Sequence, residues 1–445
     1  MSQKSLSSQK SELFQRDTVR RIAAEWEKGP IVLQDVVHDP VFAHSDFMSG
    51  LLYASQKYRK SPPPPPWRVF VDGRPAAKEE LQRLAVQSEA QPFEDYAKRL
   101  ELEFPKQDVS IILDRCEKGL PRVRRSLMPL LHDLFSIVGY PARLNHACLY
   151  AGRYRTTAFG IHKDPCHVLM FCGIGKKVMA FWPPDYFASH EGINDRLPYA
   201  DVSQYLRDAT ILEITPRDLL YWPADYWHVS ISEADHFNAA ISLGIYHRGT
   251  SVEQFLSTDF LKTQSPATWV KDYPAWDIHG IQVEAEGRLS PTDLRQTDFN
   301  KFFDYWNQVL EILSKPGERE FHALKLALEL ITSAGFGKLP QAPLPSPRHL
   351  AGAILSCEVP QALMTAASKD GLLVGANGSV SFHAFDVETI DVVVEQLRTG
   401  NQVVFDSLLA STTSGQQVCT ETVLRHAIEA GAIDLIENSQ KDMFP

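Results

Sequence analysis

The sequence predicts an α+β protein whose core is a β-sandwich or small barrel, with helical regions on either side. Between residues 147 and 246, short apolar or alternating runs follow one another, and glycines and prolines separate them. Many short strands with regular turn signals are typical of a sandwich or barrel. Helical periodicity precedes this region and returns after about residue 249. The predicted strands are residues 147–151, 166–174, 177–182, 210–214, 218–222, 227–233 and 238–246.

The region before the predicted core begins with a polar segment, residues 1–12, which we expect to be disordered. A short apolar run predicts a strand at Ile31–Leu33, and the prolines of residues 61–67 predict a stiff spacer or surface loop. Five Lys and Arg residues between Arg115 and Arg125 indicate a solvated loop face. Apolar residues at helical spacing predict helices over residues 11–28, 78–102 and 121–137.

The region after the predicted core divides into two further parts. Residues 251–345 are expected to be helical, because aromatic and apolar residues of 298–313 recur every three or four positions, and Pro-rich residues 340–347 predict a linker. Residues 346–445 carry a hairpin signal, Asn377-Gly378, inside an apolar run. A ribbon with three short helices predicts a winged-helix-like domain. The predicted helices are residues 386–398, 401–410 and 418–430.

Composition excludes several classes of protein. The 445 residues contain no apolar run near the roughly 20 residues that cross a bilayer, so we expect no membrane span. A net charge of −10 argues against a nucleic-acid partner. The six cysteines form no C-x-x-C pair, which argues against a disulfide framework and a zinc–thiolate site. Reduced thiols and the lack of a secretory signal at the N-terminus predict a cytoplasmic protein.

Two histidines and an aspartate in the predicted core have the chemistry of a metal site. His162-Lys-Asp164 opens the β-rich region, and residues two apart on an extended strand share a face. His228 follows a strand and a proline-containing turn, and it lies on the polar face of a further predicted strand. Two imidazoles and one carboxylate can occupy one face of a metal ion and leave three positions open. That arrangement is typical of non-haem Fe(II) oxygenases.

The His-x-Asp pattern alone is weak evidence, because the chain contains a second one, His44-Ser-Asp46. Residues 46–60 have helical spacing, so His44 is expected to be a surface residue near the start of a helix. A structural histidine without a metal is the competing interpretation for His228 as well. The interpretation as a metal site therefore depends on the whole set of residues and not on one motif.

Lys177 adds to that set. It begins a predicted strand, on the same face as Met179 and Phe181, and a lysine that faces a barrel interior is costly to bury without an anionic partner. A dicarboxylate co-substrate would supply the partner. The alternative is that Lys176 and Lys177 only cap an exposed turn.

These residues together resemble the cupin-fold Fe(II)/2-oxoglutarate oxygenases of the JmjC type, and within them the ribosomal-oxygenase group. The family's H-x-D is followed fifteen residues after the His by a Lys or Arg, here Lys177. Its later G-D-x-L-Y-x-P-x-x-W-x-H element is matched by residues 218–228, with Arg217 in place of the usual Gly. The resemblance implies a double-stranded β-helix, or jelly-roll, as the core. It extends over residues 145–247, and more weakly to the C-terminal region.

The resemblance also implies roles for single residues. His162, Asp164 and His228 would hold iron, and Lys177 would pair with the far carboxylate of 2-oxoglutarate. Tyr150 and Ser242 match positions that also contact the co-substrate. The Asn that often precedes the Tyr by two positions is Cys148 here, which departs from the pattern. By analogy, residues 13–250 would form the catalytic domain with a helical elaboration at its N-terminus, and the helices of 251–345 would form a homodimer contact.

The reaction that the resemblance implies uses Fe(II), 2-oxoglutarate and O2. It would hydroxylate a side chain of a protein or peptide, either a ribosomal protein or a ribosomally made precursor peptide, and would release succinate. One alternative is a hydroxylase of the same fold that acts on a small molecule or amino acid. Another is a regulator that binds DNA or a partner and whose cupin is only structural. A metal-dependent isomerase or a dioxygenase without 2-oxoglutarate would leave Lys177 unexplained.

Overall fold

A computed structural model of the chain divides into two compact units. The first contains residues up to 248 together with 333–340, and the second contains residues 249–332 and 341–445. The predicted domain limits stay a prediction. The structure describes residues 13–15, 17–60, 67–86, 88, 91–141, 144–188, 197, 199–232, 236–247, 316–338, 350, 353–368, 370–384, 387–399, 402–410 and 412–436.

The helices that precede the core differ in part from the prediction. The first helix is shorter than predicted. Residues 13–15 are joined to Val36 and Val37 by a β-bridge and a backbone hydrogen bond, and α1 begins only at Thr18. The predicted helix over 78–102 is two helices, with α4 starting directly after Pro92. Proline lacks the amide hydrogen that a helix interior needs, which explains why α4 begins after Pro92, whereas α3 already ends at Leu84. The helical elements are α1 (Thr18–Ala24), α2 (His44–Lys60), α3 (Lys78–Leu84), α4 (Phe93–Glu103), η1 (Cys116–Lys118) and α5 (Pro121–Val138).

The basic run between Arg115 and Arg125 is helical and not a loop; four of its five basic residues are exposed, as predicted, and Arg124 is the exception. Most of the run lies in η1 and in the first turns of α5. Arg124 is buried and donates a hydrogen bond to the Gly337 carbonyl at 2.7 Å. Burial lowers the pKa of Arg124 to about 10. Arg122 pairs with Asp46 of α2, so two residues of the run stabilise the packing of this unit.

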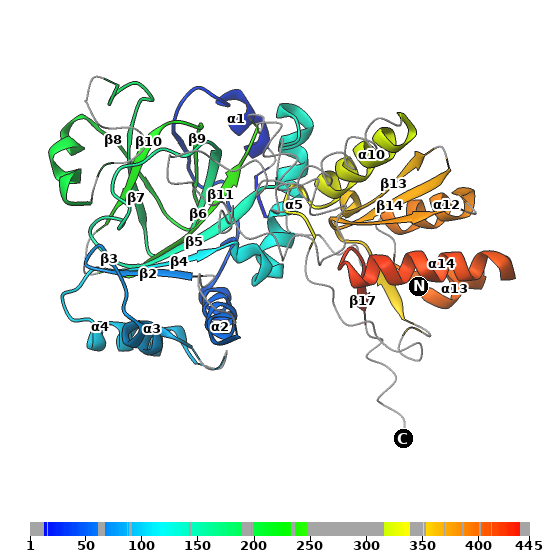
Figure 1. The fold of residues 1–445 in the computed structure, drawn as a ribbon, viewed down its shortest axis with the longest axis horizontal. Helices are drawn as coiled ribbons and strands as arrows, with labels where there is room; N and C mark the ends of the chain where they lie inside the picture. Colours follow the sequence, from blue (N-terminus) through cyan, green and yellow to red (C-terminus); the bar gives the residue numbers. More distant parts are fainter. Residues whose placement is uncertain are drawn as a thin grey trace, which may run out of the picture. The chain divides into compact units, whose positions relative to one another are not determined.

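The core of the first unit consists of two antiparallel sheets (Figure 1). The larger has the strand order β1-β9-β6-β11-β5-β4-β2-β3, and the smaller has the order β10-β7-β8. This is a jelly-roll-like core, as the sequence predicted, and all seven predicted core strands are present. The strands are β1 (Ile31–Leu33), β2 (Trp67–Val71), β3 (Arg74–Pro75), β4 (Val109–Asp114), β5 (His146–Arg153), β6 (His167–Ile174), β7 (Lys177–Trp182), β8 (Thr210–Ile214), β9 (Leu219–Trp222), β10 (Trp227–Ile231) and β11 (Asn238–Ile245).

Strands β7 and β10 of the smaller sheet are largely buried on both faces, with successive side chains packing on opposite sides. Ala180 and Trp182 of β7 and Val229 of β10 pack outward against Phe187 and the turns of η2 (Tyr199–Asp208). The opposite face of the smaller sheet, which includes Met179 and Phe181, packs in a separate cluster with Trp222 of β9 in the larger sheet. A space between sheets that carries polar as well as apolar side chains is where a jelly roll can hold a ligand.

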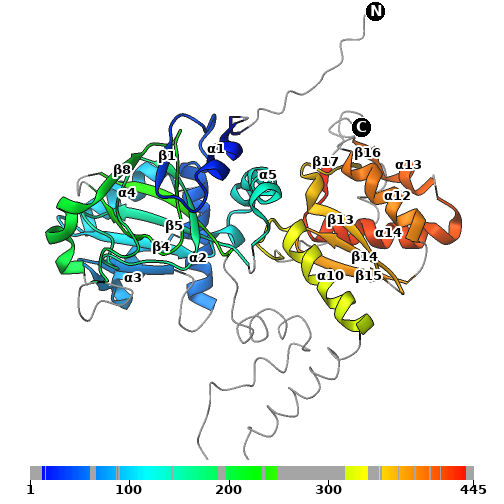
Figure 2. The same cartoon turned by 90° about the horizontal axis from the view of Figure 1, so that it is seen from above.

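The second unit carries two small antiparallel sheets with the strand orders β16-β12-β17 and β13-β14-β15. The predicted hairpin is confirmed, because β14 and β15 pair around Asn377 and Gly378, both at positive φ. Figures 1 and 2 show α10 beside β13 and β14. The elements are α10 (Pro316–Thr332), β12 (Ile354–Ser356), η5 (Pro360–Ala362), β13 (Leu363–Ser368), β14 (Gly371–Ala376), β15 (Ser379–His383), α12 (Val387–Arg398), β16 (Val403–Val404), α13 (Phe405–Ala410), α14 (Ser414–Glu429) and β17 (Asp434–Ile436).

Some predictions for this unit and its surroundings are not tested. The helix predicted over 401–410 is β16 followed by α13, and the unit contains more strands than a ribbon and three helices. Its winged-helix character stays a prediction. Residues 1–12, the prolines of 61–66, the aromatic segment 298–313 and the Pro-rich segment 340–347 lie outside the described residues. In the part of the chain that is described, no helix has the length and apolar character to cross a bilayer.

Candidate functional site

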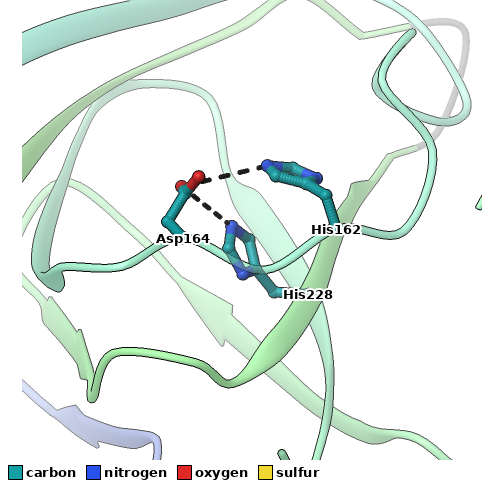
Figure 3. A group of neighbouring side chains, drawn as sticks. All are labelled: His162, Asp164 and His228. Carbon is teal, nitrogen blue, oxygen red and sulfur yellow. Dashed lines mark ion pairs between the residues drawn. The ribbon is translucent and has the colours of Figure 1, made fainter. Parts of the chain in front are cut away.

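His162, Asp164 and His228 converge in the first unit. Their ligand atoms, one from each side chain, all lie within 4.8 Å of one another. Asp164 Oδ2 lies 4.0 Å from Nε2 of His162 and 3.7 Å from Nε2 of His228. In Figure 3 the carboxylate faces both imidazole rings. The sequence therefore predicted correctly which three side chains come together.

The hydrogen bonds of both imidazoles fix which ring nitrogen is available. Nδ1 of His162 lies 3.1 Å from the Gly160 carbonyl oxygen, and Nδ1 of His228 lies 3.0 Å from that of Tyr226. A carbonyl only accepts, so Nδ1 must carry the proton in each ring. Nε2 of each ring then points toward Asp164. Metal-bound histidines commonly donate their other N–H to a carbonyl in this way.

The segment that carries His162 and Asp164 is not the regular strand that the sequence predicts. It lies beside β10 and is joined to it by isolated bridges, Thr156 with Ile231 and His162 with His228. The His162 and His228 backbones exchange two hydrogen bonds of 3.1 and 2.8 Å. Gly160, at a φ of +71°, closes the turn before His162. The backbone is extended enough for side chains two residues apart to share a side.

A tight turn brings the second histidine into place. β9 ends at Trp222, and β10 begins at Trp227, so four residues reverse the chain. Asp225, at a φ of +67°, donates its backbone N–H to the Asp164 carbonyl oxygen at 2.9 Å. The turn that presents His228 is therefore bonded directly to the segment that presents the carboxylate.

The donor set suits a divalent metal of the first transition series. Two neutral imidazoles and one carboxylate on one side of an ion form the facial triad of non-haem Fe(II) oxygenases. Cysteine thiolates, which would favour zinc or an iron–sulfur cluster, do not belong to this cluster. Bonds of about 2.1 Å would draw the three donor atoms to about 3 Å from one another.

A cavity between the two sheets opens onto this cluster. It holds about 370 Å³ of empty space, part of which is open to solvent. Both sheets contribute, since Met170 and Ser242 come from the larger and Lys177 and Met179 from the smaller. The lining residues are Tyr150, Thr157, Phe159, His162, Asp164, Met170, Lys177, Met179, Trp222, His228, Ser230 and Ser242.

Lys177 is the strongest sign that the cavity takes an anion. Only 1% of the residue is exposed, which excludes the alternative of an exposed turn cap. Its ammonium donates to the Tyr154 hydroxyl and to Asn238 Oδ1, the latter at 3.2 Å, and lies 4.8 Å from the centre of the Tyr154 ring. All these partners are neutral. In the described residues no carboxylate pairs with Lys177, although a buried ammonium normally has an anionic partner.

The two remaining predicted contacts also line the cavity. Tyr150 of β5 and Ser242 of β11 both contribute to its wall. Burial raises the pKa of the Tyr150 phenol well above its ordinary value, and Asp164 raises it further, so the hydroxyl is a neutral donor. Cys148, where the family often has Asn, is not among the lining residues, and its thiol lies 3.5 Å from Asp114 Oδ1.

The second His-x-Asp pattern forms no such cluster. His44 is the first residue of α2, its side chain is 51% exposed, and its ring stacks on Phe93. Asp46 turns inward, accepts the Ala43 N–H at 2.7 Å and pairs with Arg122. The expectation that His44 lies on the surface near the start of a helix is confirmed.

Sequence reasoning missed Tyr154 and Asn238, which hold the Lys177 ammonium, and it missed Thr157 and Phe159 in the cavity wall. Tyr154 lies four residues after Tyr150, a spacing that on an extended chain places both on one side. That signal was present in the sequence. The contact of Asn238 with Lys177 depends on how distant strands pair, and no local pattern shows it.

Comparisons with known proteins give a result for structure only. No protein-family model matches the sequence, and no curated protein matches it either. The crystal structure of the Escherichia coli ribosomal oxygenase YcfD is similar, with a TM-score of 0.50 and 12% identity, over 95% of this chain and 99% of that chain. An X-ray structure of E. coli ycfD has a TM-score of 0.49 and 15% identity, over 94% and 97% of the two chains.

A third structure, of YcfD in complex with cobalt and 2-oxoglutarate, has a TM-score of 0.48 and 13% identity, over 94% of this chain and 98% of that chain. At such identities, likeness is evidence about fold alone. The class that the fold defines is the ribosomal-oxygenase-like jelly roll, as the sequence resemblance predicted. The E. coli ribosomal oxygenase YcfD is one protein with a similar fold.

Proposed function

We propose that this chain is an Fe(II)- and 2-oxoglutarate-dependent oxygenase that hydroxylates a side chain of a protein or peptide. The observation that carries the proposal is the pairing of two features in one cavity. Three side chains with the donor set of a facial triad converge at its opening, and a buried ammonium without an anionic partner lies in its wall. An iron ion and a dicarboxylate together account for both features.

Each side chain has a distinct role in this proposal. His162, Asp164 and His228 would hold the iron, with the Gly160 and Tyr226 carbonyls accepting from Nδ1 and leaving Nε2 of each ring as the ligand atom. Lys177 would pair with the far carboxylate of 2-oxoglutarate, helped by the Tyr150 and Ser242 hydroxyls. When bound, iron supplies the oxidising chemistry with O2 and 2-oxoglutarate, which yields succinate, carbon dioxide and a hydroxylated product.

The apolar wall of the cavity has a protective role in the same scheme. Met170, Met179 and Trp222 line the cavity together with Lys177 and the metal ligands, and they belong to one buried apolar cluster. A water-poor cavity strengthens the interaction between the Lys177 ammonium and a carboxylate. It also limits reaction of the oxidising centre with solvent.

A macromolecular substrate is favoured over a metabolite. The chain carries a second compact unit beyond the jelly roll, and the similar crystal structure is that of a ribosomal oxygenase. We propose a ribosomal protein or a ribosomally made precursor peptide as the substrate class, and a cytoplasmic homodimer as the working form. The dimer contact would involve residues 251–345.

The test uses absorbance under argon. Fe(II) followed by 2-oxoglutarate should produce a metal-to-ligand charge-transfer band with the wild-type chain. The His162→Ala variant should lose the band, and the His44→Ala variant should keep it, because His44 is remote from the cavity. In air, the wild type should release succinate. A wild-type chain that forms neither the band nor succinate overturns the proposed function.

The alternatives give different outcomes in the same experiment. Succinate release that depends on a free amino acid, without a mass gain of 16 Da on any peptide, would indicate a small-molecule hydroxylase. A chain whose cellular role survives both His162→Ala and Asp164→Ala would be a regulator with a structural cupin.

A further inference from the structure

The wall of the cavity continues onto an exposed part of the larger sheet. Residues directly opposite one another in antiparallel strands share a face. Arg68 of β2 lies opposite Ile112 of β4, which lies opposite the cavity residue Tyr150 of β5. Asp114 is aligned in the same way, through Cys148, with the cavity residue Ser242. Arg68 and Asp114 therefore lie on the cavity-facing side of the sheet.

Phe159 connects this exposed area to the metal ligands. Its ring centre lies 5.7 Å from that of His162 and 6.5 Å from that of Tyr150. The same ring centre lies 5.0 Å from the Arg68 guanidinium carbon, and 5.5 Å from the ring of Phe70. Phe159 thus contacts both the Arg68 guanidinium and His162. We call Arg68, Phe70 and Phe159 the entrance platform.

Asp114 fixes the position of the Arg68 guanidinium but does not bind all of its N–H groups. Nε and Nη2 each donate to one oxygen of Asp114 at 2.7 Å, in the bidentate geometry that guanidinium and carboxylate favour. Within the described part of the chain the other N–H groups of Arg68 have no hydrogen-bond partner, and 45% of the side chain is exposed. A guanidinium that is already fixed loses little entropy when it binds a second carboxylate.

The charges around the cavity argue in the same direction. Asp164, a predicted metal ligand, is the one carboxylate among the described residues that line the cavity. A cationic substrate side chain that entered the cavity would have no free carboxylate to pair with, and the Arg68 guanidinium would repel it. An anionic side chain would pass a guanidinium that can receive it.

We propose that Arg68 is a specificity-determining residue that binds a carboxylate of the substrate, so that the substrate is an acidic peptide. This inference rests on the proposed function and names the substrate class of the same site. The 5.0 and 5.7 Å contacts of Phe159 together correspond to about three residues of extended chain. The acidic residue therefore lies within about three positions of the residue that is hydroxylated.

The experiment measures binding and does not need metal. Three pools of fluorescein-labelled nine-residue peptides carry random uncharged residues and differ only at a central fixed position, which is Glu, Gln or Lys. Fluorescence anisotropy with the metal-free full-length chain should show the Glu pool binding about tenfold more tightly than the Gln pool. The Lys pool should bind more weakly than the Gln pool.

Two Arg68 variants sharpen the test. Arg68→Met should abolish the preference for the Glu pool, and Arg68→Glu should reverse it in favour of the Lys pool. Arg74→Met is the matched control, because Arg74 forms a similar bidentate pair with Glu80 and is 54% exposed, yet has no contact with Phe159. It should keep the wild-type preference.

The wild-type pools decide the matter even if a variant does not fold. Equal binding of the three wild-type pools, or preference for the Lys pool, overturns the role of Arg68, as does a Glu preference that survives Arg68→Met. The proposed function fails separately, through the absence of the charge-transfer band and of succinate. Peptide preference without the band would leave an acidic-peptide binding site that is not an oxygenase.

Discussion

The segments around His162 and His44 both place a histidine two residues before an aspartate, but they have different backbones. His44 and Asp46 lie in the first turn of α2, where side chains two positions apart point in nearly opposite directions. His44 therefore lies on the surface, and Asp46 turns inward to Arg122. His162 and Asp164 lie on an extended segment beside β10, and their side chains meet at 4.0 Å. Backbone conformation thus decides whether the same pair of residues can share a metal.

The largest expected effect is the difference in Fe(II) binding between variants of Asp164 and of Asp46. Asp164→Ala should weaken Fe(II) binding by more than about 100-fold, because removing a metal ligand weakens binding more than removing a residue that only hydrogen-bonds to a ligand. It should change the free energy of unfolding by less than about 0.5 kcal/mol, since Asp164 is 42% exposed and pairs with no lysine or arginine among the described residues. Metal titration and thermal melting measure the two effects.

Asp46→Ala is the matched variant and should behave in the opposite way. It removes an acceptor for the Ala43 N–H and the partner of Arg122, which should lower the free energy of unfolding by about 2 kcal/mol. Fe(II) binding should stay at the wild-type level. Equal loss of metal binding in the two variants would mean that the distinction between the segments is wrong.

A smaller difference, in the affinity for 2-oxoglutarate, is expected between variants of Lys177, which begins β7, and of Lys176, which precedes it. Lys177→Met should weaken 2-oxoglutarate binding by about 30-fold or more, as expected for the loss of one partner of a buried ion pair. Because this ammonium is buried among neutral groups, the variant should be as stable as the wild type or more stable by about 1 kcal/mol. Titration of the charge-transfer band and urea unfolding measure the two effects.

Lys176→Met controls for the loss of positive charge. Lys176 is 42% exposed and pairs with Glu213 at 3.3 Å, and such surface pairs contribute about 0–1 kcal/mol. Its affinity for 2-oxoglutarate should be unchanged. If both lysine variants lowered the affinity for 2-oxoglutarate equally, the anion would be attracted by the general positive charge and not by a contact with Lys177.

The parts of the fold that depend on local periodicity could be predicted from the sequence. The core strands and the Asn377-Gly378 hairpin follow from alternation and turn chemistry, and Lys177 was found by its distance along the chain from His162. Contacts between distant strands could not be predicted in this way. Arg124 was expected in solvent, but its acceptor, the Gly337 carbonyl, lies 213 residues away. Nothing near Arg124 in the sequence indicates that carbonyl.

The same limit applies to the candidate site. The three predicted metal ligands come together through a backbone bridge between His162 and His228, which are distant in the sequence, so the set was found from motif spacing and family resemblance and not from local periodicity. Asn238 and Arg68 depend on strand pairing across the larger sheet, where a shift of one residue would turn each side chain to the other face. A single sequence does not fix that register, so the residues that hold Lys177 and those that form the entrance platform emerge only from the structure.

The smallest effect concerns how Lys177 is held. Tyr154→Phe removes the hydroxyl that accepts from the ammonium but keeps the ring that lies 4.8 Å from it. One hydrogen bond contributes about 0.5–1.5 kcal/mol, so 2-oxoglutarate should bind about three- to tenfold more weakly, with Fe(II) binding unchanged. Tyr186→Phe, whose hydroxyl bonds to Asp208 on the outer side of the smaller sheet, is the control and should have no effect. Unchanged 2-oxoglutarate affinity in Tyr154→Phe would show that Asn238 and the protein backbone suffice to position the ammonium. A 30-fold loss of 2-oxoglutarate affinity in Lys177→Met, together with a few-fold loss in Tyr154→Phe, would identify Lys177 as the group that binds the anion. Tyr154 would then be the group that orients the Lys177 ammonium.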